Sequence, residues 1–222
     1  AYPEDGMPKD RYRMYHVERA KAGIAMTMTA GSAAVSRDSP PVFNNILAYK
    51  DEVVGWMKRL ADDCHEQGCA VMIQLTHLGR RTRWDKGDWL PVVSSSNLRE
   101  PAHRAFPKKA EEWDIARITR DYADAAERMK AAGIDGIEFL CHGHLLDQFM
   151  SPLTNTMDGP YGGSLENRAR LTMEIVKAVR DRIGHVAGDE IEQGVGADVV
   201  GRRGAQHRED LAGEDAFVET VV

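Results

Sequence analysis

The sequence predicts a parallel α/β fold of the (β/α)8 TIM-barrel type, although an incomplete one, and three observations lead to this prediction. Short apolar segments alternate with longer segments in which apolar residues recur every three or four positions. The apolar segment at residues 70–75 is continuous, as in the buried strands of parallel sheets. The alternation predicts helical crossovers between parallel strands, and 222 residues are slightly fewer than a typical complete barrel contains.

Two helix–strand units are predicted in the first third of the chain. Residues 10–22 form a helix that ends at a glycine, and residues 24–30 form a short apolar strand with interleaved threonines. Residues 50–67 form the second helix, because their apolar side chains recur at spacings of three and four. Residues 70–75 (AVMIQL) then form the next buried strand.

The next two units are predicted after a long loop. Residues 76–114 form that loop, whose length is acceptable in a compact domain only if it carries function, and we interpret it as functional. Residues 115–132 form a helix that a glycine ends, and residues 136–140 form a third strand. A further loop leads to the last helix, over residues 165–183. Residues 10–183 are therefore predicted to contain three strands and four helices of a barrel.

The domain organisation changes after residue 183. Residues 1–183 form the partial barrel domain, and residues 184–222 form an atypical C-terminal tail that is rich in Gly, Val, Asp, Glu and Arg. Residues 198–201 have the composition of a short strand, but no amphipathic period supports more structure there. Two interpretations of the tail stay open, a disrupted reading frame or truncated end and a mobile terminal segment.

Composition excludes several classes of function. Apolar residues make up 42% and charged residues 29% of the chain, as in an ordinary globular protein. A net charge of −6 gives no support to nucleic-acid binding, and no apolar run has membrane-spanning length. The three cysteines have no disulfide-framework spacing and fit a cytoplasmic location. Buried structural thiols are the favoured interpretation of Cys64 and Cys69.

Polar side chains at strand ends are the candidate site residues. Gln74 ends a buried strand, where an amide needs a ligand or a backbone group to cap. His142 and His144 follow the third strand and are separated by one glycine. An active-site role is favoured for this pair over a structural role, and a metal site with Asp147 is the least favoured, because no further ligand is evident. We therefore predict no metal.

The segment DGIEFLCHGHLLDQFMSPLTNTMDGPYGGSLENRAR, at residues 135–170, resembles the flavin-dependent Old Yellow Enzyme (NADH:flavin oxidoreductase) family, as does QLTHLGRR at residues 74–81. The resemblance implies FMN as cofactor and hydride transfer as the chemistry. It implies that Thr29 and Gln74 contact the cofactor. It also implies that His77 and Arg80 face the substrate pocket.

The resemblance further implies catalytic roles for the two histidines. His142 matches the second of two family residues that bind the polar group of the substrate, and the first has no clear counterpart. His144 occupies the position at which many ene-reductases place a proton-donating tyrosine, and imidazole can donate a proton too. The first polar residue is missing and a histidine replaces the tyrosine. With these two departures, the sequence resembles the amine-oxidising branch of the family, which includes dimethylglycine and N-methylproline demethylases. Four aromatic residues of the long loop could line an amine pocket through cation–π contacts: Trp84, Trp89, Phe106 and Trp113.

The resemblance thus implies oxidative N-demethylation of a small N-methylated amine, with an electron acceptor or NAD(P)H as redox partner. An NAD(P)H-dependent ene-reductase and an inactive fragment that cannot hold FMN are the alternatives. Strands 1 and 5–8 of the barrel are not recognisable in this sequence. Larger family members carry an iron–sulfur cluster and a second dinucleotide, whose sites are absent here. No nucleic acid or membrane partner is expected, and a homo-oligomer stays open.

The YGGSLENR segment is interpreted as structural. Gly162 and Gly163 permit a tight turn, and Ser164 is a suitable N-cap for the helix over residues 165–183. Asn167 and Arg168 are expected to tie this turn to the preceding loop.

Overall fold

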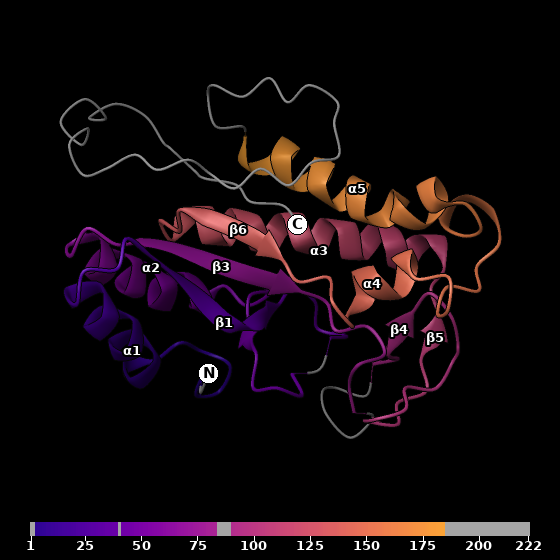
Figure 1. The fold of residues 1–222 in the computed structure, drawn as a ribbon, viewed down its shortest axis with the longest axis horizontal. Coiled ribbons are helices and arrows are strands. Elements are labelled where there is room, and N and C mark those ends of the chain that lie inside the picture. Colours follow the sequence, from indigo (N-terminus) through magenta and orange to yellow (C-terminus); the bar gives the residue numbers. More distant parts are fainter. Residues whose placement is uncertain (1–2, 40, 84–89, 185–222) are drawn as a thin grey trace.

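The structure, a computed structural model, describes residues 3–39, 41–83 and 90–184. The alternation of helices and strands follows the prediction (Figure 1). The long elements are α1 (Asp10–Lys21), β1 (Met26–Ala34), α2 (Glu52–His65), β3 (Ala70–Thr76), α3 (Glu112–Ala131), β6 (Gly136–Phe139) and α5 (Leu165–Ile183). The short ones are β2 (Ile46–Leu47), β4 (Val93–Ser94), β5 (Lys108–Lys109), α4 (Leu145–Met150) and the 3-10 helix η1 (Gly159–Tyr161). The predicted tail lies outside the described residues, except for Gly184.

The main sheet is parallel throughout, with the strand order β2-β1-β3-β6. Strand β3 is central: Met26 pairs with Ala70 on one side, and Gln74 pairs with Glu138 on the other. The register between β1 and β3 shifts between Thr29 and Ala33. Because the strands are parallel, their carboxyl ends meet at one edge of the sheet, where barrel enzymes place their sites.

The two faces of the sheet differ in burial. Val71, Ile73 and Leu75 alternate along β3 and have no exposed surface, because they point toward the helices. The opposite face carries Gln74, which is partly exposed, and Met26, which is 51% exposed. In a barrel this second face is the interior, so the interior side of these strands is accessible in the described part of the chain.

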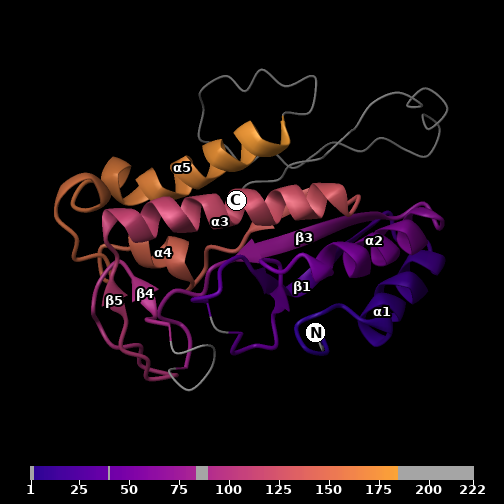
Figure 2. The same cartoon turned by 180° about the vertical axis from the view of Figure 1, so that it is seen from behind.

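The helices form the outer layer. Figures 1 and 2 show α1, α2 and α3 along the sheet, with α5 packed against α3. One apolar core joins the helices to the sheet and includes Met57, Leu60, Tyr122, Ile137 and Ile175. The two cysteines Cys64 and Cys69 are buried and unbridged in this layer, as predicted.

Helix α3 begins at Glu112, three residues before the predicted start. The prediction took the first apolar residue of the helical period as the start. The structure has a capping box instead, in which Glu111 and Asp114 satisfy each other's backbone N–H groups. The first helical turn is therefore polar, and no apolar period reveals it.

Two segments predicted as loops contain short elements. Helix α4 follows the third strand directly, because Gly143 has a φ of 72° and His144 is extended, which turns the chain into the helix. The long loop contains the parallel pair β4–β5, which is joined through Val93 and Lys108. Buried serines at positions 94, 95 and 96 show that this loop packs onto the domain.

The turn before α5 has the predicted structure. Ser164 Oγ accepts a hydrogen bond from the backbone N–H of Asn167, and α5 spans the predicted residues. Arg168 Nε donates to the carbonyl of Met150 at 2.7 Å, and Asn167 donates to that of Gly159 at 3.2 Å. The capping interaction and both ties to the preceding loop confirm the structural interpretation of this motif.

The two glycines of the turn should differ in their tolerance of a side chain. A Cβ at Gly162 would lie 1.8 Å from the carbonyl oxygen of Met157, which is backbone and cannot rotate away. A Cβ at Gly163 would meet nothing within 4 Å, although its φ of 76° disfavours alanine. We expect Gly162→Ala to lower the free energy of unfolding by about 2–3 kcal/mol and Gly163→Ala by only about 1 kcal/mol, as measured by urea unfolding. Equal losses would contradict the predicted contact.

Candidate functional site at the carboxyl edge of the sheet

Gln74 and Glu138 form a polar pair on the interior face of the sheet. Gln74 Nε2 donates a hydrogen bond of 2.8 Å to Glu138 Oε1, and the two residues are register partners on β3 and β6. Both side chains are partly exposed. Among the described residues, this is the one hydrogen bond of the Gln74 amide, so its carbonyl oxygen and second N–H remain available to a ligand.

His142 lies exposed just beyond β6, at the same edge of the sheet. The next residue, Gly143, has its backbone N–H bonded to Asp147 at 2.9 Å. A Cβ at Gly143 would lie 2.4 Å from Nη1 of Arg81, so the missing side chain lets that guanidinium approach the backbone. The predicted pair of histidines is thus joined by a glycine whose φ of 72° disfavours a side chain.

His144 has a different environment from His142. It is only 4% exposed, its Nδ1 lies 2.6 Å from Thr76 Oγ1, and its ring stacks on Phe43. Burial, helped by the positive charge of Arg81, lowers the pKa of His144 to about 4. The imidazole is therefore neutral at physiological pH. Its protonation as a general acid is disfavoured, and its contacts fit a positioning role better than proton donation.

His77 does not face a pocket. Its side chain is completely buried, and its Nδ1 accepts the backbone N–H of Gly79 at 3.0 Å. The other ring nitrogen therefore carries the proton that is donated to Asp38, at 3.1 Å. This arrangement corrects the expectation that His77 faces the substrate pocket, because the ring is buried and both of its nitrogens have a partner within the protein.

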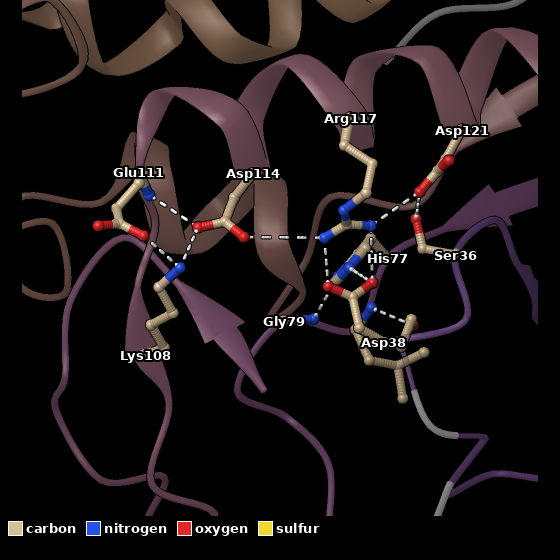
Figure 3. A network of polar contacts seen from close by, with 11 residues as sticks. Ser36, Asp38, His77, Gly79, Lys108, Glu111, Asp114, Arg117 and Asp121 are labelled. Carbon is tan, nitrogen blue, oxygen red and sulfur yellow. Dashed lines mark hydrogen bonds and ion pairs between the residues drawn. The ribbon is translucent and has the colours of Figure 1, made fainter. Parts of the chain in front are cut away.

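Asp38 connects His77 to helix α3 (Figure 3). Arg117 donates to both carboxylate oxygens of Asp38 and also contacts Asp121 at 2.9 Å. Burial alone would raise the pKa of Asp38, but His77 and Arg117 outweigh this effect and hold the pKa well below its usual range. A charged, buried network therefore anchors the loop after β3 to α3.

Thr29 lies on the outer side of the sheet. Its side chain is 1% exposed and bonds to the hydroxyl of Tyr12 on α1, while Thr27, on the same face, contacts His16 at 2.7 Å. The side chain of Thr29 thus points away from the interior face that carries Gln74. If Thr29 contacts a cofactor, as predicted, it does so through its backbone, because its hydroxyl is used within the fold.

Gln148 is the residue that joins the loops of the site. Its Oε1 accepts from the backbone N–H of Arg80 at 3.0 Å and from Ser94 Oγ at 2.8 Å. Its Nε2 donates to the carbonyls of Leu78 and Gly143, each at 3.1 Å. Three chain segments therefore meet on one buried amide. We did not predict this role, although an isolated amide in the apolar run LLDQFM was a visible signal.

A pocket of about 250 Å³ opens beside these loops. The loop after β3 contributes Arg80 and Arg81 to its lining, and the segment after β6 contributes Gly143 and Asp147. The long loop contributes His103 and its neighbours. Arg80 lines this pocket, and its guanidinium also donates to the carbonyl of Leu98 at 3.1 Å.

The aromatic residues of the long loop do not form the predicted pocket wall where they are described. Phe106 is 73% exposed and Trp113 is 60% exposed. The Trp113 indole N–H bonds to Glu111, and Lys108 lies over its ring. Trp84 and Trp89 lie outside the described residues. Both described rings contact cations of this chain instead of lining a pocket, since Arg99 lies over Phe106 and Lys108 over Trp113.

No group of three or more His, Cys, Asp or Glu side chains among the described residues could hold a metal ion. None of the described helices is long and apolar enough to cross a membrane.

The parallel strands and the helices outside them define a barrel of the α/β class, with polar side chains at its carboxyl edge. Residues 1–205 match the family described as NADH:flavin oxidoreductase / NADH oxidase, and the chain belongs to this family. Morphinone reductase has a similar fold, with a TM-score of 0.77 and 26% identity over 82% of this chain. The predicted incomplete TIM barrel is thereby confirmed.

Three relatives are similar to this chain in sequence. The probable N-methylproline demethylase of Rhizobium meliloti (strain 1021) is 70% identical over 83% of this chain. The N,N-dimethylglycine/sarcosine dehydrogenase of Chromohalobacter salexigens is 42% identical over 84%. The multifunctional alkene reductase/demethylase of Caballeronia cordobensis is 43% identical over 81%. The resemblance to the amine-demethylating branch is confirmed by these similarities.

The chain covers only part of each of these proteins. It spans 27% of the Rhizobium protein, 28% of the Chromohalobacter protein and 53% of morphinone reductase. The activities of the longer proteins therefore apply to this chain only as proposals.

Proposed function

We propose that this chain carries part of the site of an FMN-dependent oxidoreductase that oxidises a small N-methylated amine, of the N-methylproline or dimethylglycine type. The observation that carries the proposal is the half-satisfied amide of Gln74 on the accessible interior face of the sheet. The names of the Rhizobium and Chromohalobacter relatives support the demethylation chemistry.

The residues present fit a flavin. The pyrimidine edge of the ring alternates hydrogen-bond donors and acceptors, which one amide can match with its free oxygen and N–H. Gln74 would hold this edge, and the backbone near Thr29 would lie beside it. FMN, when bound, supplies the hydride chemistry that amino-acid side chains lack.

The protein side chains would orient the amine and handle its protons. Exposed His142 binds the polar group of the substrate and carries a proton at an imidazole nitrogen. Neutral His144 braces the turn that presents His142, through its contact with Thr76. Loss of hydride from an N-methyl carbon gives an iminium ion, and water hydrolyses that ion to an aldehyde and the demethylated amine. A nicotinamide or another electron acceptor would complete the cycle.

Flavin retention tests this proposal. We expect the chain, incubated with FMN and desalted, to keep a visible flavin spectrum. We expect Gln74→Leu to weaken FMN affinity about 10-fold, because a ligand hydrogen bond is lost, whereas Gln67→Leu on the surface of the same chain changes nothing. His142→Ala should retain flavin and lose amine turnover.

A colourless protein would favour the alternative of a fragment unable to hold FMN. A second candidate function, NAD(P)H-dependent reduction of activated alkenes, is favoured by the name of the Caballeronia relative. Turnover of enones but not of secondary and tertiary amines would support that candidate over the demethylase.

A further inference from the structure

Arg81 differs from the other buried or half-buried arginines of the site region in its partners. Arg117 pairs with Asp38 and Asp121, and Arg80 donates to a backbone carbonyl. Arg81 is partly buried and its backbone N–H donates to the carbonyl of Leu78, yet its guanidinium makes no hydrogen bond or ion pair with any of the residues that the structure describes. Its guanidinium lies 5.6 Å from the centre of the Phe43 ring and against the backbone of Gly143.

The position of this cation points to an anionic ligand. A guanidinium withdrawn from water is stabilised by a carboxylate or phosphate, which accepts two parallel hydrogen bonds from it. Arg81 lines the pocket described above, and Gly143, on which it rests, directly follows His142. An oxyanion bound by Arg81 would therefore belong to a molecule that reaches the proposed site of chemistry.

The size and charge of the pocket distinguish two sources of such an oxyanion, the carboxylate of a small molecule and the phosphate of a dinucleotide. The pocket, at about 250 Å³, lies below the usual range for drug-sized ligands and far below the size of a dinucleotide. Its wall also carries Asp147, whose carboxylate is opposite in charge to Arg81. A small zwitterion with a carboxylate and an ammonium group matches both charges.

We infer that Arg81 binds the carboxylate of the substrate, so that the site takes N-methylated amino acids in preference to amines without a carboxylate. This inference rests on the proposed function for the identity of the ligand. Carboxylate binding by Arg81 can nevertheless be measured without turnover, so the two can fail separately.

The test compares N-methylproline with N-methylpyrrolidine, which has the same ring but no carboxylate. Binding of each to the full chain with FMN added is measured by calorimetry, and turnover is measured in parallel. We expect Arg81→Met to weaken N-methylproline binding about 10- to 100-fold and to leave N-methylpyrrolidine binding unchanged. The N-methylproline affinity of Arg81→Lys should lie between those of the unsubstituted chain and Arg81→Met, because lysine keeps the positive charge but lacks the planar guanidinium. The matched control is Arg99→Gln, whose exposed side chain lies over Phe106 outside the pocket.

Each outcome decides one of the two proposals. Arg81-dependent binding of N-methylproline without turnover would support the carboxylate site and contradict the demethylase function. Equal binding and turnover of the two amines would support the function and overturn the carboxylate site. Absence of N-methylproline binding would also overturn the carboxylate site. Displacement of N-methylproline by inorganic phosphate or NADH at lower concentration would assign Arg81 to a phosphate and overturn the inference too.

Discussion

Acidification from pH 6.5 to pH 4 is expected to lower the free energy of unfolding by about 3 kcal/mol for each of His16 and His144. Burial lowers the pKa of both imidazoles to about 4. The folded protein therefore takes up these protons less readily than the unfolded chain does. This stability is fully present above pH 6.5 and is lost as the pH falls toward 4.

The origin of the two shifts is the same. His16 contacts Thr27 beneath α1, and His144 contacts Thr76 beneath α4, and neither exposes more than 4% of its surface. Urea unfolding at half-unit steps of pH would measure the effect. His16→Asn and His144→Asn should each remove about 3 kcal/mol of the pH-dependent loss, since a neutral amide has no proton to gain.

The control for this experiment is Gln67→Leu, because Gln67 is exposed and its amide has no titratable proton. Its pH profile should match that of the unsubstituted chain. If His144→Asn showed that same profile, the buried neutral imidazole that we assign to His144 would be wrong, and its role as a proton donor would regain support.

Gln148→Leu is expected to destabilise the protein by about 3–5 kcal/mol. The substitution leaves the partly buried carbonyl of Gly143 without a donor and removes one of the two donors to the carbonyl of Leu78, which keeps the N–H of Arg81. It also leaves the N–H of Arg80 and the hydroxyl of Ser94 without an acceptor. Each unsatisfied group costs desolvation energy that the apolar side chain does not return.

Gln67→Leu provides the comparison, because Gln67 is exposed after α2 and its replacement should change stability by less than about 0.5 kcal/mol. Unfolding in urea, followed by tryptophan fluorescence, gives both values. A loss below about 1 kcal/mol in Gln148→Leu would mean that water replaces the amide, and that the three loops do not depend on it.

The Gln148 network also bears on the site itself. Its bond to the carbonyl of Gly143 holds the backbone next to His142, and its bond to Arg80 holds the loop that contributes Arg81 to the pocket. The residues proposed to bind substrate are therefore held in place by hydrogen bonds to the buried Gln148 side chain, as precise binding geometry requires.

The sequence by itself determined the elements whose signals are local. Helix α5 runs over the predicted residues 165–183, because its apolar period and the Ser164 cap lie within the helix and its first turn. The start of α3 was missed for the converse reason, since its capping box is polar and interrupts no apolar period. Gln74 and His142 could be selected as candidates because polar residues that follow apolar strands are rare and visible.

Only the tertiary structure decided which candidates are accessible. His142 and His144 are two residues apart, yet one is exposed and the other is buried against Phe43, about a hundred positions earlier. Asp38 meets His77 and Arg117 across separations of 39 and 79 residues. Such contacts form because parallel strands bring distant loops to one edge of the sheet, and no local sequence pattern predicts which side chains come into contact there. The sequence therefore determined the chemistry available, and packing determined which side chains can reach a ligand.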